Sequence, residues 1–463
     1  MAYTSSKSNR PNEFANKTNH THLINDKEIQ DFLKKCSLPK KSQGNTLKDS
    51  GLLLELQEPK INPIKYVIAI DGGYTPIEVQ KDFPSSTVAF FQFGAFILKL
   101  EDWKNLGNQT FISPEEMSKF NELERIKLVL PTKLVSLETE PCFTDSVRKT
   151  IYDFFMKEVD GVALMETLKW LIYEEYQPNG RTKGEYMLLN PNESEKSINL
   201  FEQTLKNDFT FEIAGKVVYL SDVFELTKTV SDEIGAECIL GNLSTFIEQI
   251  ILVHYIRQIL KNSPKILEEV LFIKDGSLAF FDVSFKLRKP MRKLIKFLFE
   301  RHNLYLVGLE KSGAFTDHAV SIAAEKEENG EFVSRLPRGQ FFLLDNDYIY
   351  KYITPGISEI KTYGMNMYYS GKVILKTSDG NIFVASLPMS VVEDREYDIV
   401  IRNPSRNAYK NIDTILYNLS LLKCQMYDNA LVPITLVNKL VSLANHPSQG
   451  ILEKFVKDSI NKH

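Results

Sequence analysis

Two hydrophobic runs in this chain each stop at an aspartate followed by a glycine. The first covers Tyr66 to Asp71 and the second Val270 to Asp275, and both contain β-branched residues. Short apolar runs that are bounded by glycine are typical of strands buried in a sheet. We therefore expect both strands to end at the rim of one sheet, where the two carboxylates are open to solvent or to a ligand.

The remaining pattern predicts further strands and several helices. Ser86 to Leu100 predicts one bent strand or two joined strands, and Leu304 to Leu309 predicts another buried strand. Two β-hairpins are expected in the last third, at Gln340–Ile353 and at Lys372–Leu387. Helical spacing predicts helices at Lys27–Lys35, Asp145–Val159, Gly161–Tyr176, Leu243–Leu260, Arg406–Tyr427, Ile434–Ala444 and Ile451–Ile460.

The length of the chain and the order of its elements predict an α/β fold class. The 463 residues exceed the size of roughly 250–300 residues at which single cores usually stop growing, so we expect two lobes or one large domain with insertions. The expected insertion is helical, from about Asp102 to Gly241, and the β-hairpin additions fall at about 338–390. Residues 1–22 are polar and predict a flexible tail before a domain that covers 23–463.

Composition places the chain among ordinary globular proteins, with 43% hydrophobic and 25% charged residues. The most apolar stretch, Val88 to Leu100, is shorter than the ~20 residues that a membrane-spanning helix needs, so we expect no membrane association. The four cysteines show no zinc-binding or redox spacing. This predicts reduced thiols in a cytoplasmic protein.

The net charge of −4 excludes a protein that binds nucleic acid over its whole surface, so any positive surface must be local. One basic cluster follows shortly after the second Asp-Gly pair and contains Lys286, Arg288, Lys289, Arg292 and Lys293. Such a run is commonly the solvated face of a helix. Its position near the second aspartate favours a different interpretation, in which the cluster contacts the phosphates of DNA.

Asp71 and Asp275 are the best candidates for holding divalent metal ions. Hydrolysis of a phosphodiester suits two hard cations, and such ions prefer carboxylate ligands. A single Asp-Gly pair is more often a turn, but two of them after buried strands favour a metal site. Glu248 is the preferred third acid, because an unpaired carboxylate on an apolar helix needs a partner such as a metal or Lys311; Glu237 is the second choice.

Three further residues stand out, two after the third predicted strand and one on the long apolar helix. Lys311 follows the strand that ends near Leu309 and could hold the scissile phosphate or orient the attacking water, and Glu310 beside it is another candidate acid. The alternative for Lys311 is an ordinary loop lysine. His254, a single histidine on an apolar helix, is interpreted as a core residue whose ring nitrogens are hydrogen-bonded.

The order of these motifs resembles the NurA nuclease family. The segments that carry the resemblance are Ile70 to Gly73, an apolar helix with an acid, Ile273 to Leu278, and Val307 to Ser312. The resemblance implies a ribonuclease-H-like mixed sheet, DNA hydrolysis with Mn²⁺ or Mg²⁺, and a homodimer that works with a HerA-type hexameric translocase ATPase in end resection, a form of DNA repair, or in antiviral defence. It implies that Asp71, Asp275 and Glu248 are metal ligands.

The chain departs from the family pattern in two places. Gly73 stands where the family often has serine. In the C-terminal segment, Leu431 to Leu440 lacks the tyrosine and histidine that family members often carry, with Asn438 as a polar substitute; Tyr427 and His446 lie outside the expected register.

These departures leave a second function open, a nuclease fold that has lost catalysis and serves as a scaffold or DNA-binding subunit of a translocase complex. A third interpretation, an argonaute-like guide-binding protein, shares the core but lacks an evident pocket for a guide end.

Overall fold

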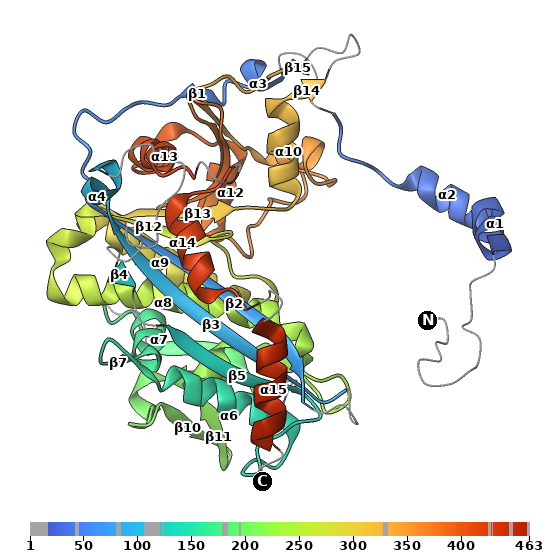
Figure 1. Ribbon diagram of the computed structural model, residues 1–463, viewed down its shortest axis with the longest axis vertical. Coiled ribbons are helices and arrows are strands. Elements are labelled where there is room, and N and C mark those ends of the chain that lie inside the picture. The colour runs from blue at the N-terminus through green and yellow to red at the C-terminus, as the bar shows by residue number, and fades with distance from the viewer. Residues whose placement is uncertain are drawn as a thin grey trace.

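The computed structural model describes residues 17–41, 46–79, 85–105, 121–122, 125–177, 184–193, 196–326, 332–424, 427, 429–443 and 448–460. They form a mixed α/β fold around one sheet of ten strands (Figure 1). The strands, in their order across the sheet, are β1 (Leu53–Glu55), β16 (Gln340–Leu343), β17 (Ser370–Lys376), β18 (Ile382–Pro388), β13 (Tyr305–Glu310), β12 (Val270–Asp275), β2 (Tyr66–Glu78), β3 (Thr87–Lys99) and β4 (Asn121–Glu122), with β5 (Ile126–Lys133) also paired to β3.

The centre of the sheet is parallel and its flanks are antiparallel. β12 pairs in parallel with both β2 and β13, whereas β3, β5, β16, β17 and β18 each pair antiparallel with their neighbours. Parallel strands need cover on both faces, and this explains why β12 is apolar at nearly every position. The carboxyl ends of β12 and β13 lie at the same edge of the sheet.

Helices cover both faces of this sheet. One face carries α6 (Phe143–Phe155), α7 (Leu164–Ile172), α8 (Leu240–Asn262) and α9 (Arg288–Arg301), and the other carries α12 (Asp394–Arg402), α13 (Ile412–Leu421) and α14 (Val432–Val441). The remaining helices are α1 (Lys17–Asn25), α2 (Lys27–Lys35), α3 (Thr46–Asp49), α4 (Leu100–Asn105), α10 (Ala314–Ala323), α11 (Asn346–Tyr352) and α15 (Ser448–Ile460). Small hairpins complete the described part of the fold: β6 (Glu158–Val159) pairs with β7 (Val162–Ala163), β8 (Glu185–Leu189) with β9 (Ser197–Phe201), β10 (Thr210–Ile213) with β11 (Lys216–Tyr219), and β14 (Glu325–Lys326) with β15 (Phe332–Val333).

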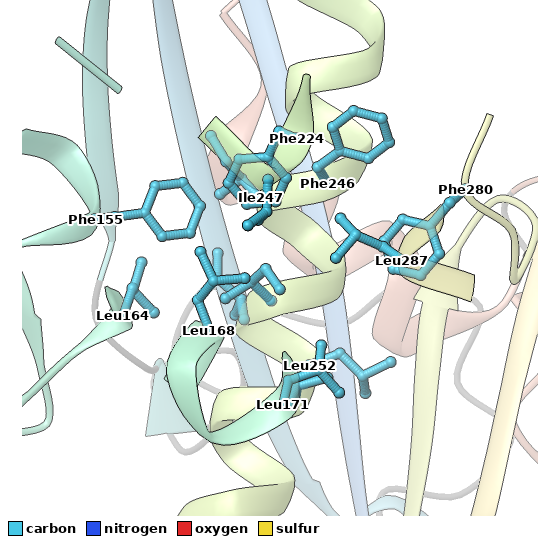
Figure 2. Close-up of a cluster of buried hydrophobic side chains, with 14 of the residues drawn as sticks. Phe155, Leu164, Leu168, Leu171, Phe224, Phe246, Ile247, Leu252, Phe280 and Leu287 are labelled. Atoms are coloured by element: carbon cyan, nitrogen blue, oxygen red, sulfur yellow. The ribbon is translucent and has the colours of Figure 1, made fainter. Parts of the chain in front are cut away.

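The largest hydrophobic core lies around α8. Phe246, Ile247 and Leu252 of this helix pack against side chains from α7 and from the segments that carry Phe224 and Phe280 (Figure 2). The segment Glu237–Asn262 is long and apolar enough to cross a membrane by length and composition alone, but 83% of its most apolar window is buried inside the protein. This burial is that of a core helix of the fold.

Several predicted elements are confirmed. The helix at Lys27–Lys35 has the predicted bounds, with Asp26 accepting hydrogen bonds from the backbone at its N-terminus. The segment from Ser86 to Leu100 forms the single strand β3, and the hairpin at Lys372–Leu387 is β17 and β18. Helices α8, α14 and α15 fall within a few residues of their predicted bounds, whereas α13 (Ile412–Leu421) is much shorter than the predicted Arg406–Tyr427.

Three predictions are corrected. Gln340–Ile353 is not a hairpin, because Asp345 accepts a hydrogen bond from the Tyr348 backbone and so caps the helix α11. The insertion at 102–241 contains α6 and α7, but also the sheet strand β5 and three small hairpins, so it is mixed rather than helical. The predicted tail of residues 1–22 overlaps α1, which begins at Lys17; residues 1–16 lie outside the described part of the chain.

Candidate metal centre

Asp71 and Asp275 lie at the same level on the two parallel strands in the middle of the sheet. β12 pairs with β2 in a register that puts Lys274 opposite Ile70, so the next residue of each strand is one of the two aspartates. Successive side chains of a strand alternate between faces. Because the aspartates hold equivalent positions in parallel strands, both carboxylates start from the same face of the sheet.

The first of these strands does not end where the sequence predicted. β12 does stop at Asp275, but β2 continues through Asp71 to Glu78 as the partner of β3. Gly72 and Gly73 therefore lie inside a strand. Their lack of a side chain serves close packing, because a Cβ at Gly72 would lie 2.5 Å from the ring of Phe93, and one at Gly73 would lie 2.8 Å from a backbone oxygen of α14.

Lys311 connects the two aspartates. It follows β13 directly, and its Nζ lies 2.8 Å from Oδ2 of Asp275 and 3.9 Å from Oδ2 of Asp71. One ammonium group thus reaches both carboxylates. The space between Asp71 and Asp275 therefore accepts a positive charge, and the prediction that the two aspartates meet at one place is confirmed by this geometry.

Glu248 reaches the same part of the sheet from α8. Its Oε2 lies 2.7 Å from Nζ of Lys274, and both side chains are less than one-tenth exposed. Oε1 accepts a 3.4 Å hydrogen bond from Ser244 and would lie 2.9 Å from a Cβ at Gly72, the residue after Asp71. The sequence predicted a metal or Lys311 as the partner of Glu248, but in the structure the partner is Lys274.

Lys274 was missed by the sequence interpretation, although a signal was present. It is the one charged residue inside the apolar run of β12, and a lysine is almost never fully buried without a partner. Its Nζ also donates a 2.5 Å hydrogen bond to the backbone oxygen of Asp275. Lys274 therefore connects the helix-borne acid to the end of β12.

Two acids of this cluster, Asp71 and Glu248, hold their protons more tightly than usual. Burial raises the pKa of Asp71 to about 8, and the nearby Asp275 and Glu248 add to this rise, which Lys311 partly offsets. Burial also raises the pKa of Glu248, against the opposing effect of Lys274. Additional positive charge would favour the ionised form of these two buried carboxyl groups.

The donor set fits a hard divalent cation, since its ligands would be carboxylate oxygens. Asp71 and Asp275 are placed to hold one, with Glu248 nearby on α8. Among the described residues, however, no three Asp, Glu, His or Cys side chains are arranged at ligand spacing. Lys274 and Lys311 each pair with one of these carboxylates, at 2.7 Å for Glu248 and 2.8 Å for Asp275.

The carboxylate of Glu310 is already engaged in hydrogen bonds and an ion pair within the chain. Its Oε1 accepts hydrogen bonds from Ser277 at 2.7 Å and from Ser386 at 3.1 Å, and it forms an ion pair with the buried Lys372. Ser277 lies two residues after Asp275. The buried pair therefore ties the loop that follows β12 to the hairpin β17–β18.

A groove lies beside Lys311, the lysine that contacts both aspartates. It has a volume of about 570 Å³ and is lined by Lys311, Tyr427, Ala430, Thr435, Asn438, Lys439 and Ser442. Asn438, the polar residue that the sequence offered as a substitute, lies in the same groove as Lys311. Tyr427, which the sequence placed outside the expected register, also lines the groove. His446 lies outside the described residues.

The basic cluster is not a DNA-binding surface as predicted. Arg288 and Arg292 are buried and each pairs with Asp394 at 2.8 Å. These pairs hold α9 to the start of α12. Arg292 also donates a hydrogen bond to the backbone oxygen of Tyr368.

Two lysines of the basic cluster also form ion pairs. Lys286 contacts Glu225 at 2.7 Å and Lys293 contacts Glu174 at 2.6 Å. Lys289 is exposed. The cluster therefore mainly fixes α9 in the fold.

Two other sequence interpretations have clear outcomes. His254 is buried and its ring nitrogens contact the Thr167 hydroxyl at 2.8 Å and the Val159 backbone oxygen at 3.1 Å, so its interpretation as a core residue is confirmed. Glu237 contacts Thr87 at the beginning of β3, far along the strand from the carboxylates, and is not the third acid.

Comparisons with known proteins give a distant likeness. No family model and no curated protein matches the chain. Among solved structures, the chain is similar to the NurA nuclease from Sulfolobus solfataricus, with 9% identity, coverage of 97% of this chain and 98% of that one, and a TM-score of 0.33. It is also similar to NurA with manganese, with 13% identity, coverage of 96% and 98%, and a TM-score of 0.20.

Proposed function

We propose that this protein is a divalent-metal-dependent deoxyribonuclease that hydrolyses phosphodiester bonds. The observation that carries the proposal is the meeting of Asp71, Asp275 and Glu248 at the end of β12, where burial raises the pKa of Asp71 to about 8. Buried carboxylates with perturbed pKa values are characteristic of functional sites. In this proposal the strands β5, β3, β2, β12 and β13 are the ribonuclease-H-like core.

Each residue has a proposed role. Asp71 and Asp275 hold Mn²⁺ or Mg²⁺, and Glu248 is the third ligand. The metal activates water and stabilises the leaving oxygen when it is bound. Lys311, about one-third exposed, leaves Asp275 and contacts the scissile phosphate, while Lys274 stays buried and keeps Glu248 close to the end of β12.

The wider assignment extends this proposal. It includes a homodimer, a cytoplasmic location, and a HerA-type translocase that delivers DNA for end resection or antiviral defence. These parts rest on the motif order in the sequence. A pull-down of the tagged protein with the product of a neighbouring translocase gene would test the partner, and sedimentation would test the dimer.

The test of the activity is cleavage of linear DNA with Mn²⁺. We expect cleavage by the wild type and none above background by Asp71→Asn or Asp275→Asn. The matched control is Asp160→Asn, an exposed turn aspartate in the β6–β7 hairpin, which should cleave like the wild type. Equal cleavage by all four proteins would contradict the assignment of the two aspartates.

A second function is favoured by one observation. The ion pairs Lys274–Glu248 and Lys311–Asp275 satisfy two of the three acids within the chain itself, as a scaffold that has lost catalysis would require. The cleavage experiment separates the two functions, because a scaffold binds DNA or its partner complex without hydrolysing DNA in any divalent metal.

A further inference from the structure

The groove beside Lys311 differs chemically from the carboxylate cluster. Two lysines, a tyrosine, an amide and two hydroxyl groups line it, and no acid lines it among the described residues. Lys439 and Asn438 are exposed, and Tyr427 as a whole residue is 51% exposed. A groove with ammonium groups and an open aromatic ring suits an anion that carries a planar group.

We propose that this groove binds one strand of nucleic acid next to the candidate metal centre, with Lys439 against a phosphate and Tyr427 against a base. The inference rests on the proposed function and specifies its substrate path. Aromatic rings that stack with bases and lysines that follow the backbone are the usual elements of single-strand binding. The volume of about 570 Å³ falls in the range of small-ligand pockets, which suits a nucleotide and its flanking phosphate.

Lys311 connects the groove to the acids. The same side chain lines the groove and lies 2.8 Å from Asp275 and 3.9 Å from Asp71. A strand that follows the groove past Lys439 would therefore bring its next phosphates toward the carboxylates. A free mononucleotide would occupy the groove without this continuity, so we commit to a strand as the ligand.

One wall of the groove is formed by α14, which packs against the strand that carries Asp71. α14, which carries Asn438 and Lys439, packs across β2 and β3 (Figure 1). Gln92 of β3 donates a hydrogen bond to the backbone oxygen of Leu440, and the missing side chain of Gly73 lets the backbone of α14 approach β2. The helix that carries Asn438 and Lys439 therefore packs directly against the strand that carries Asp71.

The test is equilibrium binding of a short labelled oligothymidylate to the full chain in EDTA, so that no cleavage occurs, followed by fluorescence anisotropy at several salt concentrations. We expect Tyr427→Ala to weaken binding by roughly tenfold and Tyr427→Phe to bind like the wild type. Lys439→Ala should weaken binding and reduce the salt slope by roughly 0.7, the value for one contact with a single strand.

The matched control is Lys265→Ala. Lys265 is exposed and precedes β12, at the opposite edge of the sheet from Asp275, and its variant should bind like the wild type. Thymidine monophosphate should compete only at concentrations far above those of the oligonucleotide. Wild-type binding by both Tyr427→Ala and Lys439→Ala would overturn the inference, as would equal competition by the mononucleotide.

The two proposals can fail separately. If the groove variants lose binding but the wild type never cleaves DNA, the nuclease proposal fails and the groove stands. If the wild type cleaves in an Asp71-dependent way and the groove variants bind DNA normally, the groove inference fails and the nuclease proposal stands.

Discussion

The ammonium group of Lys311 lies 2.8 Å from the carboxylate of Asp275, at a place that a divalent cation would also favour. The chain thus supplies its own positive charge to an acidic site. A metal ion that binds there must displace this internal cation, so the affinity for metal and the position of Lys311 are coupled.

Removing this lysine should therefore strengthen metal binding. A hydrogen bond to a charged group contributes about 1.5 kcal/mol or more, so Lys311→Ala should bind Mn²⁺ roughly tenfold more tightly. Calorimetric titration with Mn²⁺ measures this change, with Lys265→Ala as the control. Unchanged or weaker binding by Lys311→Ala would show that the lysine does not compete for the site.

The raised pKa of Asp71 makes stability depend on pH. Its carboxyl group has a pKa of about 8 in the folded protein against an ordinary value of 3.8. Between these values the folded state binds more protons than the unfolded state, so the free energy of unfolding should fall as pH rises from about 4 to about 8. Asp71→Asn should lack the part of this pH dependence that comes from the Asp71 carboxyl group. Urea unfolding of both proteins in EDTA at several pH values tests it; identical pH profiles would contradict the raised pKa.

The buried pair of Lys274 and Glu248 should be costly to break. Removing one partner of a buried ion pair destabilises a protein by about 3–5 kcal/mol, whereas replacing both with apolar residues is often neutral. Lys274→Met should therefore lower the free energy of unfolding by about this amount, and the double variant Lys274→Met/Glu248→Leu should recover most of it. Urea denaturation gives both values. If Lys274→Met were as stable as the wild type, Lys274 and Glu248 would not form a buried ion pair.

Gly73 should be intolerant of a side chain. A Cβ there would lie 2.8 Å from the backbone oxygen of Val441, and such overpacking usually destabilises by about 1–3 kcal/mol. Gly73→Ser should therefore lower the free energy of unfolding by this amount. The control is Gly450→Ala on α15, where a Cβ would meet no atom within 4 Å. If Gly73→Ser were as stable as the wild type, α14 would pack more loosely against β2 than this separation indicates.

Local patterns predicted much of the fold because they report local preferences. The apolar runs at β12 and β13 and the Asp379-Gly380 turn of the β17–β18 hairpin are set by neighbouring residues, and each is found where predicted. The end of β2 could not be predicted, since Asp71-Gly72 resembles a turn. Pairing with β3 continues the strand, and that pairing is a tertiary interaction.

The candidate site was predictable only in part. Asp71 and Asp275 were found from strand patterns, and their shared level follows from parallel pairing. The basic cluster was misinterpreted because its partner Asp394 lies about a hundred residues away in the sequence. Tyr427 lines the groove beside Lys311, although no sequence periodicity connects the two residues.

The most direct measurement is calorimetric titration of the full chain with Mn²⁺, comparing the wild type with Asp71→Asn, Asp275→Asn and the control Asp160→Asn. We predict that the wild type and Asp160→Asn bind the metal with the same affinity and that either site variant weakens binding by at least about tenfold, the loss of one charged ligand interaction. Equal affinity in all four proteins, or no binding by the wild type, would contradict a metal centre held by these two aspartates.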